Sequence, residues 1–154
     1  MAEPGAPTEG LRITRVFDAA PADVWKEWTE PHRFADWFGG RGVEVPLESV
    51  SMDVRPGGTW RATMLIPGGE RPEISWAGEY REVLEPERLV LTFTDQTSGD
   101  GYELVTVVLT DLGDGRTQMD FAQTGGHLAP EEYEQAGQGW SGFFDDMAAR
   151  LGGG

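Results

Sequence analysis

Two histidines and one glutamate are the side chains of this sequence best suited to proton transfer. His32 and His127 alone have an ordinary pKa near neutrality, and His127 follows two glycines in a loop that we expect at the mouth of any pocket. Glu79 follows Gly78 in a segment whose side chains alternate between two faces. A cyclase-like or hydrolytic reaction would use His127 or Glu79 as its acid or base. Against such a reaction, we expect both histidines to be exposed and Glu79 to point into solvent.

Other catalytic and metal-binding patterns lack residues that they need. Ser75 and Ser141 have no adjacent base, so nothing supports a serine hydrolase. The segment DLGDG at 111–115 lacks the closing glutamate of a calcium loop, and two distant histidines do not make a zinc site. Because the chain has no cysteine, thiolate metal sites and disulfides are excluded as well. The sequence therefore predicts no metal and no cofactor.

Apolar and aromatic side chains are spaced so that they could form the wall of a small-molecule site. Walls of this kind, with a few polar groups, are typical of ligand pockets. Tyr80 and Gln123 share the parity of inward-facing positions and could orient a ligand by hydrogen bonds. The alternative is that the same rings only fill the core. The predicted ligand-binding set is Trp28, Trp37, Phe38, Trp60, Met64, Trp76, Tyr80, Phe93, Met119, Phe121, Gln123, Trp140, Phe143 and Phe144.

One long helix near the end of the sequence would have to hold part of this set. A wide apolar stripe recurs there at helical spacing, and bulky rings alternate with glycines. Glycine weakens a helix by itself, so we expect packing against a sheet to stabilise this one. The stripe consists of Tyr133, Ala136, Gly137, Trp140, Phe143, Phe144, Met147 and Leu151.

Most of the remaining chain has the alternation of antiparallel strands separated by glycine and proline turns. Two short helices should begin at Pro21 and Pro31, because proline is suited to a first helical turn, and Gly39 with Gly40 should end the second. The fold class that follows is α+β, with about seven strands in a curved antiparallel sheet wrapped on the long helix. The expected strands are 11–17, 43–54, 59–66, 74–84, 88–95, 102–110 and 117–124.

Charge and composition restrict the partners and the location of the protein. The formal net charge of -15 repels phosphate backbones and anionic lipids, so we expect neither nucleic acid nor a membrane as a partner. The first ten residues resemble no secretory signal, and no apolar stretch has membrane-spanning length, which favours the cytoplasm. We expect one domain at 11–151, with flexible tails at 1–10 and 152–154. Homodimerisation through sheet edges or through Trp37 and Phe38 is left open.

Several segments of the sequence resemble the START-like (SRPBCC) superfamily, which has the helix-grip fold. The branch that they resemble is the family of the C-terminal domain of the activator of heat-shock protein 90 ATPase. The resemblance covers about 11–151 and implies a single helix-grip domain of bacterial type. The segments are APADVW at 20–25, WF at 37–38, DVRPGGTW at 53–60, GEY at 78–80, PERLV at 86–90, GDGRT at 113–117 and GWSGF at 139–143.

Three functions follow from the residues and from this resemblance. The leading hypothesis is the transport, sequestration or sensing of a hydrophobic or aromatic small molecule, bound between the long helix and the sheet. The second is a cyclase-like or hydrolytic enzyme that uses the same cavity. The third is a chaperone-associated interaction domain whose acidic surface binds a basic partner.

Overall fold

The computed structural model describes residues 10–40, 43–66, 68, 72–94, 102–125 and 129–151. His127 and the expected tails lie outside these ranges, except for Gly10, which begins the first strand. Within them, no helix is long and apolar enough to cross a membrane. The elements in chain order are β1 (Gly10–Phe17), α1 (Pro21–Thr29), α2 (Pro31–Trp37), the 3-10 helix η1 (Leu47–Ser49), β2 (Ser51–Met52), β3 (Thr59–Leu65), β4 (Glu73–Leu84), β5 (Arg88–Phe93), β6 (Glu103–Gly113), β7 (Arg116–Thr124) and α3 (Pro130–Arg150).

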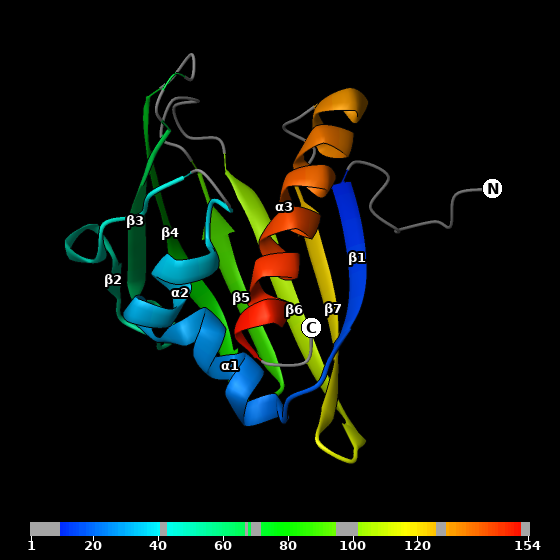
Figure 1. Cartoon of the computed structure of the whole chain (residues 1–154). Helices are drawn as coiled ribbons and strands as arrows, with labels where there is room; N and C mark the ends of the chain where they lie inside the picture. Colours follow the sequence, from blue (N-terminus) through cyan, green and yellow to red (C-terminus); the bar gives the residue numbers. More distant parts are fainter. Residues whose placement is uncertain are drawn as a thin grey trace.

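The strands form one antiparallel sheet whose inner face is covered by helices. In the described part of the chain the sheet has seven strands in the order β1-β7-β6-β5-β4-β3-β2. Figure 1 shows α3 crossing in front of the sheet next to β1, with α1 and α2 beside its C-terminal end. This arrangement confirms the predicted α+β fold, with two short helices between the first and second strands and a long helix at the end.

Alternation along the strands decides which side chains meet the helices. In β6, Val105, Val107 and Leu109 are buried on the inner face, whereas the residues between them are only half-buried. On α3, the predicted stripe packs against them, with Trp140 and Phe144 fully inside. The core therefore lies between α3 and the inner face of the sheet.

The expected strand at 43–54 is wrong, because only Ser51 and Met52 of this segment pair with β3 as a strand. Pro46 has no backbone N–H to give to a ladder, and the chain turns into η1 directly after it. The hydroxyl of Ser49 donates to the Pro46 carbonyl at 2.7 Å and accepts from the backbone N–H of Thr63 at 3.1 Å. The Ser49 hydroxyl thus accepts the backbone hydrogen bond of Thr63 that a neighbouring strand would otherwise have accepted.

Gly78 in β4 marks a close approach between strands. Trp60 in β3 donates its indole N–H across this position to the Thr92 carbonyl in β5, at 2.9 Å. A Cβ added to Gly78 would collide with that carbonyl and with the indole nitrogen. The missing side chain of Gly78 therefore lets a side chain of β3 reach the backbone of β5 across β4.

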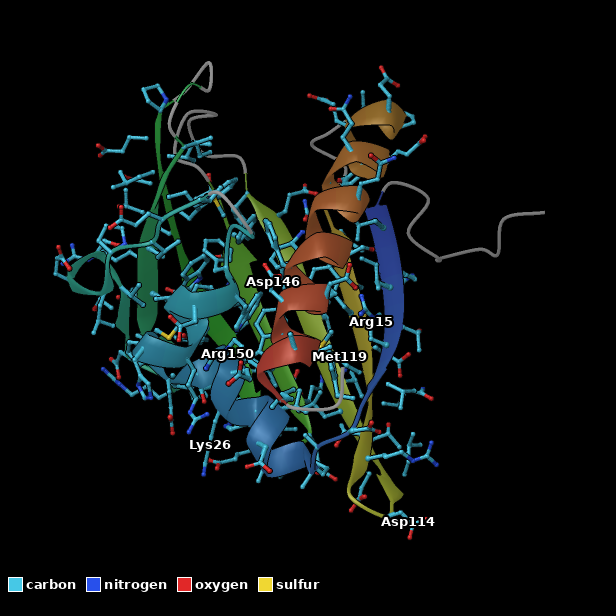
Figure 2. All side chains as sticks on the ribbon, in the orientation of Figure 1. Arg15, Lys26, Asp114, Met119, Asp146 and Arg150 are labelled. Carbon is cyan, nitrogen blue, oxygen red and sulfur yellow. The ribbon has the colours of Figure 1, made fainter. Side chains whose placement is uncertain are left out.

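A buried ion pair holds the C-terminal end of α3 against the short helices (Figure 2). The Arg150 guanidinium donates to both oxygens of Glu27, at 2.8 and 3.4 Å, and the Glu27 side chain is only 1% exposed. Arg33 adds a contact of 3.5 Å to the same carboxylate, and Asp36 accepts from Arg150 at 2.8 Å. The hydrogen bond to Glu27 raises the pKa of Arg150 above its ordinary value. Trp37 completes the junction by donating its indole N–H to the Glu27 carbonyl.

We expect Gly78→Ala to lower the free energy of unfolding by about 2–4 kcal/mol, because the methyl group must displace backbone. The matched control is Gly142→Ala on the open face of α3, where the added methyl group meets nothing. That control should stabilise the protein by about 0.5–1 kcal/mol, since alanine favours a helix. Urea unfolding of both variants measures the contrast, and equal effects would contradict the close approach at Gly78.

We expect Arg150→Met to lower the free energy of unfolding by about 2–4 kcal/mol, because it leaves the Glu27 carboxylate buried with only a distant arginine. Adding Glu27→Gln to this variant should recover more than half of the loss. The control is Arg15→Met, whose partner Asp145 is mostly exposed, and its cost should stay below about 1 kcal/mol. Additive effects in the double variant would show that the two groups do not interact.

Candidate functional site

The aromatic members of the predicted set, apart from Tyr80, come together in one cluster of ring contacts between α3 and the sheet. Ring centroids of neighbours lie between 4.4 and 6.5 Å apart, and all three described helices contribute to the cluster. The side chains of the set that are buried are Trp28, Trp37, Phe38, Trp60, Met64, Tyr80, Phe93, Met119, Phe121, Gln123, Trp140 and Phe144, whereas Trp76 and Phe143 are half-buried.

Five rings of the cluster form a closed circuit at its more open side, which we call the aromatic rim. Successive centroids along it are 4.4, 5.5, 5.4, 5.9 and 6.5 Å apart. Trp76 and Phe93 are stacked, whereas the other neighbours are tilted or edge-on. The rim joins β4, β5, α3 and the residue after α2. Its members, in circuit order, are Trp76, Phe93, Trp140, Phe143 and Phe38.

The deeper rings have the packing of a protein core. Phe144 lies inside the cluster, with Phe121 at 5.1 Å and Trp140 at 5.8 Å. Met119 is also fully buried, and Figure 2 labels it next to α3. These side chains hold α3 in position against the sheet.

A chain of polar side chains runs behind the rim. The Trp140 indole N–H donates to the Gln123 carbonyl oxygen at 2.8 Å, and the Gln123 amide donates to Glu103 Oε1 at 3.3 Å. Gln123 is 3% exposed and Glu103 is 5% exposed. The inward position of Gln123 follows the predicted parity, and its two bonds fix which way its amide points.

Two buried indole N–H groups have no hydrogen-bond partner among the described residues. They belong to Trp28, which stacks on Phe121 and Trp140, and to Trp76 of the aromatic rim. An unsatisfied buried donor costs about 1–3 kcal/mol, so native proteins seldom keep one without a reason. An acceptor on a bound molecule would satisfy such a donor.

Tyr80 lies apart from the other predicted polar group. Its backbone pairs with Gly57 and Gly58 in the turn before β3, and its side chain is 1% exposed. Burial raises the pKa of the phenol, and the negative charge of Asp53 raises it further. Tyr80 is thus a buried neutral phenol next to a turn.

Neither Glu79 nor His32 joins the cluster. The Glu79 side chain is 48% exposed and forms an ion pair with Arg81 at 3.1 Å, and His32 is 64% exposed beside Glu30. His127 lies outside the described residues. Among the residues that are described, no group of three histidine, aspartate or glutamate side chains could hold a metal ion.

Sequence reasoning missed Glu103, which is the carboxylate nearest to the aromatic rim along the polar chain. The signal was available, because Glu103 has the same parity as three buried residues of its strand. It was overlooked because an acidic residue at the start of a strand usually faces solvent.

A hollow of about 510 Å³ lies on the opposite, outer face of the sheet. Strand register places its residues on β1, β5, β6 and β7, and all of them except Phe121 lie in rows that face away from α3. Phe121 is the member of the predicted set that also borders it. The lining is polar for the most part and consists of Arg12, Thr14, Arg88, Thr106, Val108, Asp120, Phe121, Ala122 and Thr124.

Comparison with protein families gives one match over most of the chain. The model of the family described as activator of Hsp90 ATPase homolog 1-like protein matches residues 18–152. No curated protein matches the sequence.

Several solved structures share the fold. A Chromobacterium violaceum protein has a TM-score of 0.80 and 23% identity, over 93% of this chain and 97% of that one. A Mycobacterium smegmatis protein has a TM-score of 0.76 and 23% identity, over 94% and 91% of the two chains. A Plasmodium falciparum protein described as an HSP90 activator has a TM-score of 0.71 and 17% identity, over 94% and 96%. At these identities the likeness concerns the fold alone.

The raised pKa of Tyr80 predicts a loss of stability in alkali. Unfolded tyrosine ionises at about pH 10, whereas folded Tyr80 stays protonated, so this contribution is complete below about pH 10 and is lost as the pH rises further. Absorbance titration of the protein and of Tyr80→Phe should give equal tyrosinate signals near that pH while both are folded. In urea, where both proteins are unfolded, the tyrosinate signal of the unaltered protein should exceed that of Tyr80→Phe by one tyrosine. A one-tyrosine difference in the folded state would show that the phenol is accessible.

Proposed function

Because the chain belongs to the activator of Hsp90 ATPase homolog 1-like family, we propose that it binds a hydrophobic or aromatic small molecule between α3 and the inner face of the sheet. The unpartnered indole N–H of Trp76, at the aromatic rim, is the observation that carries this proposal. A rim of aromatic rings offers apolar contact, and the free donor offers one oriented hydrogen bond. The protein would transport, sequester or sense its ligand.

Apolar contact alone is sufficient for useful affinity at such a site. Covering about 200 Å² of ligand surface contributes roughly 5 kcal/mol before the entropic cost of association is subtracted. One hydrogen bond to Trp76 adds about 0.5–1.5 kcal/mol and fixes the orientation of the ligand. The deep part of the cluster need not open, because its rings already fill it.

Close packing of the deep rings also favours a second candidate, a protein-interaction domain of the chaperone-associated kind. A core that is filled by its own side chains needs no ligand to be stable. The family description and the Plasmodium falciparum HSP90 activator name a partner of that class for related proteins. A complex formed through the acidic surface would weaken steeply with added salt.

Native mass spectrometry of the protein purified from the cells that make it tests the leading proposal. We expect an additional mass that is lost when the same sample is denatured. In Trp76→Phe, which keeps a ring but removes the N–H, the retained fraction should fall about two- to tenfold. The control Tyr102→Phe changes an exposed aromatic residue and should leave occupancy unaltered.

A protein that retains no molecule and also fails to bind naphthylmethanol, a neutral aromatic probe, would contradict the leading proposal. A salt-sensitive complex with an Hsp90-type chaperone in that same sample would then support the second candidate.

A further inference from the structure

Glu103 is an unusual residue for the place that it occupies. It begins β6, a strand in the middle of the sheet, on the face that packs against α3. Only 5% of it is exposed, and the next inward residues of the strand are Val105 and Val107. Removing a carboxylate from water is costly unless charged or hydrogen-bonding partners compensate it.

The neighbours of Glu103 connect it to the aromatic rim. Its Cα partner across the β5–β6 ladder is Phe93, a rim residue on the same face of the sheet. Through Gln123 it is linked to Trp140, whose ring centroid is 5.5 Å from that of Phe93. The Glu103 carboxylate is therefore connected to two rings of the aromatic rim, to Phe93 by strand pairing and to Trp140 by two hydrogen bonds.

A carboxylate beside aromatic faces has the chemistry that recognises an organic cation. The carboxylate accepts a charge-assisted hydrogen bond, and ring faces attract the same positive charge. A carboxylate offers about four acceptor positions, so an ammonium group can join the partners that Glu103 already has. An anionic ligand would meet a like charge at this point and would be rejected.

We propose that Glu103 selects aromatic or apolar ligands that carry a protonated amine, and discriminates against carboxylic acids of the same shape. This inference rests on the proposed ligand-binding function, since it names the chemical class of that ligand. Trp140 and Phe93 provide the ring faces, and Gln123 positions the carboxylate.

Calorimetric titration with three naphthalene compounds of matched shape tests the inference. Naphthylmethylamine is a cation at neutral pH, naphthylmethanol is neutral and naphthylacetate is an anion. We expect the amine to bind the protein at least about tenfold more tightly than the alcohol, and the acid to bind more weakly than either. Half-molar salt screens the long-range attraction of the net charge of -15, and the preference should persist in it.

Glu103→Gln keeps the shape of the side chain and removes its charge. It should weaken binding of the amine about 10- to 100-fold and change binding of the alcohol less than about twofold. The matched control is Glu87→Gln, which removes an exposed charge near the other end of β5 and should leave both affinities unaltered. If near-UV circular dichroism shows that Glu103→Gln is not folded, the order of affinity of the unaltered protein for the three compounds tests the role of Glu103 instead.

The outcomes separate the two proposals. Equal binding of amine and alcohol, or an amine affinity that survives Glu103→Gln in a folded protein, would overturn the role of Glu103 and leave the ligand-binding function standing. Failure of all three compounds to bind would overturn the role of Glu103, and in a protein that also retains no molecule from its cells it would overturn the ligand-binding function as well.

Discussion

The position of α3 against the inner face of the sheet is the constraint on which the rest of the structure depends. The inner face of the central strands is mostly apolar, and a helix that contains Gly137, Gly139 and Gly142 would be marginal without that contact. Three polar attachments set its register: Arg15 to Asp145 from the first strand, Trp140 to Gln123 in the middle, and Arg150 to Glu27 at the end. Apolar burial supplies the driving force, and these directional contacts select one arrangement.

Two carboxylates buried by this packing, Glu27 and Glu103, have different surroundings. The Glu27 carboxylate pairs with Arg150 and lies 3.5 Å from Arg33, so its charge is compensated within the fold, while its backbone carbonyl accepts from the Trp37 indole. Glu103 accepts from the Gln123 amide and is the strand partner of Phe93, a ring of the aromatic rim. The first carboxylate connects helices to one another, whereas the second lies beside the aromatic rings, and this is why our proposal assigns recognition to Glu103 and not to Glu27.

Local patterns predicted much of this fold, and contacts between distant segments account for what they missed. Strand parity placed Gln123 inward, and the stripe from Tyr133 to Met147 predicted the buried face of α3. The 43–54 strand failed because Pro46 and the Ser49 hydroxyl together outweighed β propensity. The pairing of Glu27 with Arg150 joins residues 123 positions apart, and no local pattern contains that information. Likewise, the unpartnered donor of Trp76 is visible only when the neighbours of its nitrogen are known.

The strand order leaves the sheet with two dissimilar edges. At one edge β2 has only two residues, too few to give another chain a continuous row of hydrogen-bonding groups. At the other, β1 has eight residues, but Arg12 and Arg15 interrupt its length with charge. Two copies that approached one another along these edges would also bring together formal charges of -15 each. The architecture that encloses the rings thus protects the chain against fibrous self-association, with no need for a closed barrel.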